Sequence, residues 1–574
     1  MATEVLLSPG VLSIENDQSF TTQQPVQAGA AIIGPTVKGP VGIPTIVTSY
    51  SDYLTKYGST FTSGSQTYTY LTSISAYNYF QNGGTSLLVT RVVSGSFTPA
   101  TSSLIPTSLV NTGSFILETL SEGKIMNSTS TLNTDGTLPS GSADNFRWQI
   151  VSPNTSSGTF SLLIRQGNDS TNSPSVLETW GPLSLDPFSP NYIEKIIGNQ
   201  YQTITQDNGE YFLQLNGNYA NQSRYIRVKQ VLTPTPNYLN NSGNPKPEYT
   251  GSIPIAASGT FGAATGDNIP STAGTYYENI SNINPQGIPA SNYTESISLL
   301  SNKDEFKYNF ITVPGLILNS SFPTHASAIS LLVANCQNNG NSMAIIDVAG
   351  YGSNIIPVTT AAATLDSSYA ATYWPWVQTI DPNTSQRVWV PASTLIPGVY
   401  AFNDTSSEVW NAPAGINRGV MSNAVMAERY LTQGNRDTLY EANVNPIATL
   451  SNTGVTVFGQ KTLQKKSSAL DRVNVRRLLI ELKNYISQVA DTLVFEQNTI
   501  ATRNNFLLQV NPYLASVQQR NGLSSFRVVM DETNNTPTTI DNNQLIGAIY
   551  LQPVKSAEFI YLTFNVTPTG VSFE

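Results

Sequence analysis

The stretch that decides how the C-terminal third folds is DRVNVRRLLIELKNYISQVADTL, residues 471–493. Its apolar side chains recur at helical spacing and form one stripe, made by Val475, Leu478, Leu479, Leu482, Ile486 and Val489. We therefore predict a helix over these residues, with the carboxylate of Asp471 at its positive end.

The residues after this helix predict a second helix and three extended runs. The second helix spans Thr502 to Arg520, because Asn521-Gly522 just beyond it suits a left-handed cap. Strand-like runs follow at 526–530 and 545–551, and a further apolar run at 557–566 closes the region. Whether this last run pairs within its own chain or with a neighbouring chain is the main functional question.

The composition limits what the protein can be. At 574 residues the chain is too long for one ordinary core, which predicts two to four domains. Charged residues make up 11% of it, against about 25% in typical soluble proteins, and a surface so poor in charge suits lasting contacts with neighbours. The net charge of −9 argues against nucleic-acid binding, which normally requires a basic excess.

The sequence contains no recognisable export or membrane signal. No basic start followed by an apolar run indicates a signal peptide, and no apolar stretch approaches the roughly 18 residues of a spanning helix. The single cysteine, Cys336, excludes an intrachain disulfide and a cysteine-based zinc site. We expect folding in a cytoplasm, without membrane insertion.

The patterns predict an α/β fold class, in a mixed α+β arrangement over several domains. Apolar runs predict strands at 30–34, 45–47, 87–93, 309–314 and 343–348. Helices are expected from Ser51, over 70–80 and over 325–335. The order strand, helix, strand over 309–348 predicts a right-handed parallel crossover.

A composition change separates the expected domains. Ser, Thr, Asn, Gly and Pro dominate residues 96–299, where only short strand-like pieces stand out, so we expect a β-rich surface insertion of one or two subdomains there. The expected division is an N-terminal arm at 1–22, a middle α/β domain at 23–95 plus 300–407, the insertion, a C-terminal α/β core at 408–554 and a C-terminal arm at 555–574.

Enzyme chemistry finds little support in the sequence. The single histidine, His325, lacks a neighbouring nucleophile and carboxylate, so a polar residue at a helix start is the favoured reading. Gly350-Tyr351-Gly352 follows a predicted strand but lacks the third glycine of a dinucleotide loop, which favours a plain turn. Asp531-Glu532 does not match a calcium loop. We expect no catalytic residues, no cofactor and no metal.

Half of the chain's 28 Lys and Arg residues lie from Glu408 onward. Several cluster closely, namely Lys461, Lys465, Lys466, Arg472, Arg476 and Arg477. Two readings stay open for this cluster: a solvated loop and helix start, or a patch that faces an acidic partner.

The C-terminal third resembles the tail sheath proteins of contractile-tailed bacteriophages. The resemblance is carried by WNAPAGINRG at 410–419, NVNPI at 443–447, DRVNVRRL at 471–478, FEQN at 495–498 and VMDETNNTP at 529–537. Weaker matches lie at LSPGV (7–11), Gly39-Pro40 and residues 87–93, whereas the insertion at 96–299 shows no visible match.

The resemblance implies a structural protein rather than an enzyme. Members of this family stack as six-subunit rings in a helical array around a tail tube, are stored extended, and contract to drive the tube through the host envelope. The implied partners are further copies of the chain, the tail tube protein, and baseplate and tail terminator proteins. The implied location is the virion tail, assembled in the bacterial cytoplasm.

The resemblance also implies strand exchange between subunits through both arms. The implied strand donors are Val11, Leu12, Ile14, Phe559, Ile560, Tyr561, Leu562, Phe564 and Val566. The implied acceptors are Phe526, Val528, Val529, Leu545, Ile546, Ile549 and Leu551. The candidates to face the tube are Lys461, Lys465, Lys466, Arg472 and Arg476.

Two other readings remain open. One is the sheath of a contractile injection particle that is not a phage. The other belongs to a different class, a β-rich surface protein that binds glycans, for which the Tyr and Trp content is permissive but no export signal exists.

Overall fold

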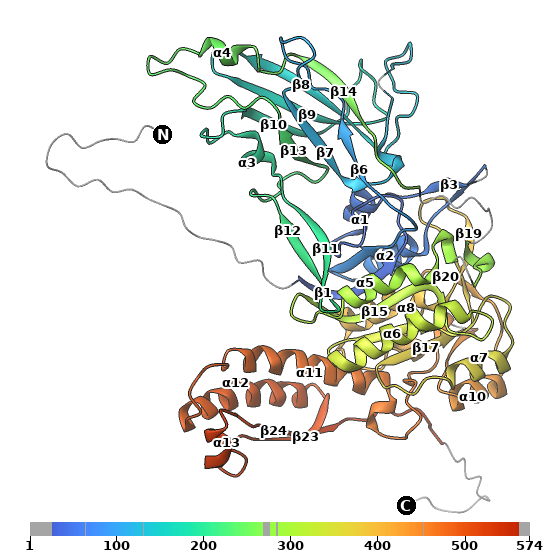
Figure 1. The fold of residues 1–574 in the computed structure, drawn as a ribbon. Coiled ribbons are helices and arrows are strands. Elements are labelled where there is room, and N and C mark those ends of the chain that lie inside the picture. The colour runs from blue at the N-terminus through green and yellow to red at the C-terminus, as the bar shows by residue number, and fades with distance from the viewer. Residues whose placement is uncertain are drawn as a thin grey trace, which may run out of the picture.

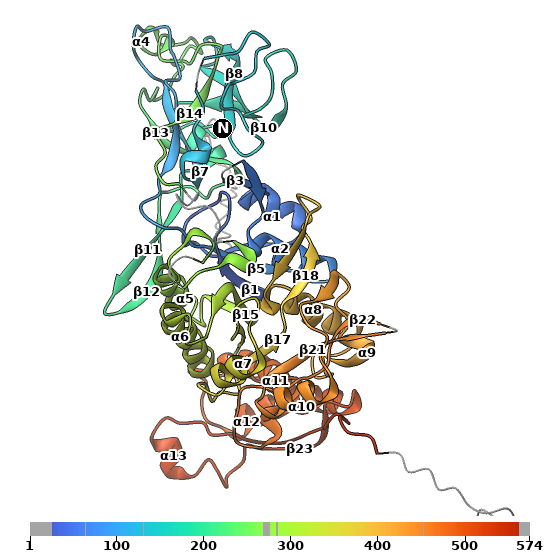
Figure 2. The same cartoon turned by 90° about the vertical axis from the view of Figure 1, so that its right-hand side faces the viewer.

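The computed structural model describes residues 26–561, apart from 64, 130, 268–275, 283–284 and 452. Three units follow one another along the long axis of the molecule (Figure 1). A β-rich unit lies at one end, a large α/β unit in the middle, and a smaller unit of three helices and two strands at the other end. The view turned by 90° shows the same order (Figure 2).

An eight-stranded sheet forms the middle unit, in the order β2-β5-β1-β15-β16-β17-β21-β22. The strands are β1 (Val26–Gly34), β2 (Thr45–Val47), β5 (Leu87–Arg91), β15 (Phe306–Ile317), β16 (Met343–Asp347), β17 (Ala370–Trp374), β21 (Asn445–Leu450) and β22 (Gly454–Val457). The six inner strands run parallel, and β2 and β22 close the two edges antiparallel.

Helices cover both faces of this sheet, which explains why its strands read as continuous apolar runs. Along β1, Ala31 and Ile33 enter the core that contains Ile329 of α6, whereas Ala30 and Ile32 enter the core that contains Ile74 of α2. The helices of this unit are α1 (Tyr50–Tyr57), α2 (Leu71–Gln81), α5 (Tyr293–Leu299), α6 (Pro323–Asn339), α7 (Ile355–Ala362), α8 (Ile396–Ser406), α9 (Gly415–Arg418) and α10 (Gln433–Glu441).

The predicted α/β elements are confirmed. Strands β1, β2 and β5 and helices α1 and α2 lie where the apolar patterns predict them, and β15, α6 and β16 form the predicted parallel crossover. Small antiparallel sheets complete the unit, made by β3 (Phe61–Ser63) with β4 (Gln66–Tyr68), and by β18 (Val377–Ile380) with β19 (Arg387–Val390) and β20 (Ala424–Ala427).

The β-rich unit is built by the residues of the predicted insertion. Its seven-stranded sheet has the order β10-β9-β8-β14-β6-β7-β13. The strands are β6 (Pro99–Ser102), β7 (Phe115–Glu122), β8 (Phe146–Asn154), β9 (Thr159–Gln166), β10 (Val176–Ser184), β13 (Ile226–Val231) and β14 (Ala257–Gly262), with short helices α3 (Ile193–Ile197) and α4 (Pro247–Thr250). A hairpin of β11 (Tyr201–Asp207) and β12 (Glu210–Asn216) reaches back, and its Ile204, Tyr211 and Leu213 pack on the middle unit.

The third unit contains α11 (Val473–Asp491), α12 (Ile500–Gln519), β23 (Leu523–Val529), α13 (Pro537–Asp541) and β24 (Ala548–Pro553). The predicted stripe of α11 faces α12, where Leu478, Leu482 and Val489 meet Phe506, Val510 and Leu514. The rings of Tyr485 and Tyr513 stack with their centroids 3.7 Å apart. The predicted cap after α12 is confirmed, because Asn521 has a φ of 60°.

Two predicted boundaries differ from the structure for local reasons. Helix α11 begins at Val473 rather than Asp471, because Asp471 ends a short 3-10 turn and pairs with Arg472. The strand predicted from Leu545 begins at Ala548 instead, because the Asn535 side chain bonds both the N–H and the carbonyl of Ile546 and holds that residue in a loop.

The middle sheet also extends past the domain boundary expected at residue 408. Strand β21 pairs with β17, and β22 pairs with β21, so residues 445–457 complete the middle sheet. In the structure α11 links the two units: its Val473 and Ile480 enter the middle core, whereas Leu478, Leu482 and Val489 enter the C-terminal core. No helix in the described ranges is long and apolar enough to cross a membrane.

Candidate functional site

The candidate site is the two-stranded antiparallel sheet of β23 and β24, with the chain that leaves it. Phe526 pairs with Leu551 and Val528 with Ile549, and these four side chains turn toward α11 and α12. Because the sheet has only two strands among the described residues, each strand presents one edge without a partner there. A free edge of this kind can accept a strand from another segment.

Both faces of this sheet are incompletely covered. Phe526, Val528, Ile549 and Leu551 are half-buried rather than buried, and Tyr550 on the opposite face is 62% exposed. An isolated two-stranded sheet is marginally stable, and here the helices supply the support on one face only. The site therefore has both backbone groups and apolar surface left for a further strand.

The structure brings most of the predicted acceptors together. Phe526, Val528 and Val529 lie on β23, and Ile549 and Leu551 lie on β24. Leu545 and Ile546 belong to the loop before β24, so they are not strand residues, although Leu545 packs on the core of this unit.

The predicted donors are only partly within the described residues. Phe559, Ile560 and Tyr561 follow β24 without strand structure, and they are 67%, 77% and 90% exposed. The remaining predicted donors lie outside the described residues, namely Val11, Leu12, Ile14, Leu562, Phe564 and Val566.

Between β24 and these exposed residues the chain is attached to the body. The N–H of Val554 donates to the Gly522 carbonyl at 3.2 Å, and the Asn474 amide donates to the Ser556 hydroxyl at 3.2 Å. The Glu558 carboxylate then accepts three hydrogen bonds. Its donors are Arg472 Nε at 2.7 Å, the Tyr440 hydroxyl at 2.7 Å and Gln460 Nε2 at 3.0 Å.

Sequence reasoning missed Glu558, Tyr440 and Gln460 as site residues. The only signal for Glu558 is an acidic residue directly before a strongly apolar run, and nothing near it in sequence names its partners. Tyr440 lies 118 residues earlier and Gln460 lies 98 residues earlier.

The predicted basic patch divides into two groups. The first group is engaged in contacts within the chain. Lys461 donates to the Tyr440 carbonyl, and Arg472 pairs with Asp471 and Glu558. Arg476 is buried against the Tyr369 ring and the Ser368 hydroxyl. Arg477, the sixth residue of the cluster, is also buried. Only the side chains of Lys465 and Lys466 are exposed, and neither forms an ion pair within the described part of the chain. The structure therefore does not bring Arg476 to the surface of the single chain.

The residues considered for catalysis have structural surroundings. His325 is buried near the start of α6, where its Nδ1 accepts the N–H of Ile317 at 2.9 Å, and burial lowers its pKa to about 4. Gly350-Tyr351-Gly352 forms a turn after β16. Within the described ranges no group of three His, Cys, Asp or Glu side chains could hold a metal ion.

The crevice where α/β proteins commonly bind nucleotides is filled by the chain itself. Such crevices open at the carboxyl ends of two neighbouring parallel strands whose connections lead to opposite sides of the sheet. In this sheet those two strands are β1 and β15. The buried Gln286 side chain occupies that position: its Oε1 accepts the N–H of Leu71 at the start of α2, and its Nε2 donates to the Pro314 carbonyl. One of the N–H groups at the helix start, which a phosphate would need, is therefore already bonded.

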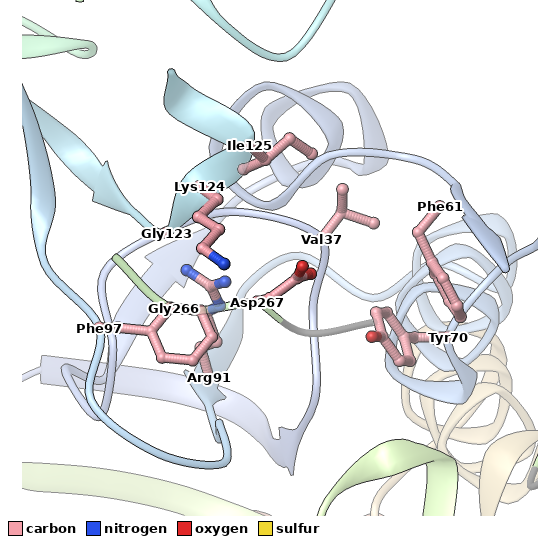
Figure 3. A pocket seen from close by; sticks show the side chains of 10 residues that line it. All are labelled: Val37, Phe61, Tyr70, Arg91, Phe97, Gly123, Lys124, Ile125, Gly266 and Asp267. Atoms are coloured by element: carbon pink, nitrogen blue, oxygen red, sulfur yellow. The ribbon is translucent and has the colours of Figure 1, made fainter. Parts of the chain in front are cut away.

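A cavity of about 260 Å³ lies where the β-rich unit meets the middle unit (Figure 3). The side chains of Arg91, Lys124 and Asp267 point toward one another there, beside the ring of Phe97. Arg91 is buried and its Nη1 donates to the carbonyls of Gly39 and Glu122, so it ties the two units together. The acid already present opposite the two cations makes this a structural junction rather than an open anion site.

Fold and site together define the class as a multidomain α/β protein whose described residues leave a strand edge open at one end. Comparison with known families is specific: a phage tail sheath protein central domain matches residues 286–463, and a phage tail sheath C-terminal domain matches residues 465–567. These two segments of the chain are therefore similar to the central and C-terminal domains of phage tail sheath proteins.

Individual relatives agree with this assignment. The tail sheath protein of Vibrio phage KVP40 is 38% identical over 216 residues, which is 38% of this chain and 31% of that protein. The tail sheath protein of Enterobacteria phage T4 is 34% identical over 224 residues, 39% of this chain and 33% of that protein. The matches thus span about a third of these curated relatives.

The fold is shared more widely than the sequence. A crystal structure of a sheath tail protein from Listeria innocua superposes with a TM-score of 0.51, at 10% identity, over 92% of this chain and 95% of that chain. At this identity the likeness concerns the fold alone.

Proposed function

We propose that this chain is the subunit of a contractile tail sheath. Copies assemble as stacked six-subunit rings in a helical array around a tail tube, are stored extended, and contract to drive the tube through a host envelope. The observation that carries the proposal is the family match over residues 286–567, which includes the open two-stranded sheet of the C-terminal unit.

The C-terminal residues have the chemistry of a strand that pairs with another copy. The run FIYLTFNV at 559–566 is rich in aromatic and β-branched residues and would be an aggregation hazard if left unpaired. Burying four or five such side chains gives roughly 6–15 kcal/mol. Ordering eight residues costs on the order of 8–16 kcal/mol. Each arm therefore adds little, and the lattice is stable because many arms act together.

The proposed contact with the tube is weak and electrostatic, which lets it break during contraction. Lys465 and Lys466 are the exposed basic residues that support this part of the proposal. Changing both to Glu is expected to reduce co-sedimentation with the tail tube protein, and wild-type binding should fall as salt rises. Unchanged, salt-independent binding of the variant would refute the electrostatic contact.

We also propose that the chain has no catalytic role and resides in the virion tail after assembly in the bacterial cytoplasm. Its further partners would be the baseplate and a tail terminator. The filled crevice at Gln286 and the buried, low-pKa His325 support the non-enzymatic part. The sheath of a non-phage injection particle remains the alternative within the class.

Electron microscopy of the purified chain tests the proposal. Long hollow tubes are expected from the full chain, whereas a version that ends at Val554 should stay dispersed because it lacks the donor run. Tubes from both would keep the sheath and refute linkage through the C-terminal run. Dispersed particles from both at high concentration would refute the sheath and favour the β-rich, glycan-binding alternative.

A further inference from the structure

The chain between β24 and the exposed C-terminal residues does not hang free from the sheet. It crosses from the C-terminal unit to the middle unit, where the Glu558 side chain is only 17% exposed. The next three residues, Phe559, Ile560 and Tyr561, are all at least two-thirds exposed. Glu558 is therefore the last described residue that is firmly attached.

Three donors from three different elements converge on this one carboxylate. Tyr440 lies on α10, Gln460 lies in the segment after β22, and Arg472 directly precedes α11. A carboxylate bound by a guanidinium and two neutral donors forms charge-assisted bonds, which are shorter and stronger than neutral ones. In an ordinary exposed ion pair, by contrast, the carboxylate has a single partner and its position is only loosely fixed.

The donors are themselves held in place. Lys461 Nζ lies 4.5 Å from the centre of the Tyr440 ring and donates to the Tyr440 carbonyl at 2.7 Å. The Arg472 guanidinium lies 5.9 Å from the centre of the same ring and also pairs with Asp471 at 3.0 Å. The groups that receive Glu558 are therefore also held by contacts that do not involve the C-terminal segment.

We propose that Glu558 is a clamp that fixes the root of the C-terminal segment to the middle unit and thereby sets where the strand-forming residues leave the subunit. The assembly role of the clamp rests on the proposed sheath function. A fixed root limits where the residues after Glu558 can reach, so it raises the effective concentration of a pairing strand near one acceptor edge of a second copy. A loose root would let the same strand reach wrong edges.

The clamp can be tested on the unassembled chain by trypsin. Lys555 is exposed and lies three residues before Glu558, so cleavage after Lys555 reports how often this root opens. Glu558→Ala should be cut there at least five times faster than wild type. Tyr440→Phe, which removes one of the three bonds, should give a smaller increase, and Glu532→Gln, an exposed carboxylate on the same unit, should give none.

Assembly is then measured on the same variants by electron microscopy. Glu558→Ala is expected to form fewer and irregular tubes, with Glu558→Gln in between because its amide keeps the shape and loses the charge. Equal cleavage of Glu558→Ala and wild type would overturn the clamp, whether or not tubes form. Faster cleavage with normal tubes would overturn its role in assembly. Absence of tubes from wild type would refute the sheath proposal, while the cleavage result would still decide the clamp.

Discussion

Arg477 on α11 and Asp404 on α8 form an ion pair with 2.5 Å between nitrogen and oxygen, and it joins the C-terminal unit to the middle unit. The guanidinium is buried with 3% exposure and lies 4.5 Å from the Tyr400 ring centre, whereas the carboxylate is 26% exposed. The two partners are therefore not equivalent. If Arg477 is removed, water can hydrate the partly exposed Asp404 carboxylate, whereas water cannot easily reach the buried Arg477 if Asp404 is removed.

This asymmetry predicts unequal costs for the two deletions. Asp404→Ala should lower the free energy of unfolding by about 3 kcal/mol, because it leaves Arg477 charged and buried. Arg477→Met should cost less, because a flexible apolar chain fills the space and Asp404 becomes hydrated. Glu408→Ala breaks the exposed pair with Arg520 and serves as the control, with an expected loss below about 1 kcal/mol. Urea unfolding of the unassembled chain measures all three, and equal costs for Asp404→Ala and Glu408→Ala would contradict the prediction.

The pKa of Asp347 leads us to expect that the free energy of unfolding falls as pH rises. This buried carboxyl group at the end of β16 accepts bonds from the Ser393 N–H and hydroxyl, and burial raises its pKa from 3.8 to about 7. The folded state therefore holds a proton that the unfolded state has released, so stability decreases between pH 4 and pH 7 by up to about 1.4 kcal/mol per unit. Asp347→Asn should flatten this slope in unfolding curves recorded at several pH values. An unchanged slope would show that Asp347 does not titrate in this range.

For His325 we expect the opposite dependence of the free energy of unfolding on pH, over nearly the same pH range. Burial lowers its pKa from 6.5 to about 4, so the unfolded state binds the proton first and stability decreases as pH falls from 6.5 toward 4. His325→Asn can still accept the Ile317 N–H through its side-chain oxygen but cannot titrate. Its unfolding free energy should therefore vary less than that of wild type over this range. An acid sensitivity equal to wild type would contradict the assignment.

We expect the substitution Phe495→Gly to stabilise the folded chain. Phe495 lies between α11 and α12 with a φ of 71° and is fully exposed, so the backbone is strained and the ring contributes no packing within the subunit. Phe495→Gly should raise the free energy of unfolding by about 1 kcal/mol, because glycine adopts this conformation without strain. Asn521→Gly at a φ of 60° is the matched control and should gain less, since asparagine tolerates the left-handed region. A loss of stability in Phe495→Gly would indicate that the ring packs within the subunit.

Local patterns in the sequence predicted the elements that bury a regular apolar face. The runs of β1 and β5, the crossover from β15 to β16, and the stripe of α11 are cases in which side-chain periodicity alone defines the structure. The left-handed residue at Asn521 was predictable for a similar reason, because few residues adopt that conformation easily. The family resemblance likewise depended on short contiguous motifs.

Boundaries and membership in a sheet were less predictable. The start of β24 depends on the Asn535 side chain holding Ile546, and no apolar pattern encodes that contact. Residues 445–457 read as part of a C-terminal domain, yet β21 finds its partner at β17, about seventy residues earlier.

The sequence by itself determined the α/β class, the aromatic and β-branched composition of residues 559–566, the absence of a recognisable catalytic motif and the resemblance to sheath proteins, because these properties reside in composition and short periodic segments. Only the tertiary structure decided which basic residues remain exposed, which crevice is filled by Gln286, and where the C-terminal segment is held. The reason is that burial and hydrogen-bond partnership are made by residues such as Tyr440 and Glu558, which come together only when distant parts of the chain pack.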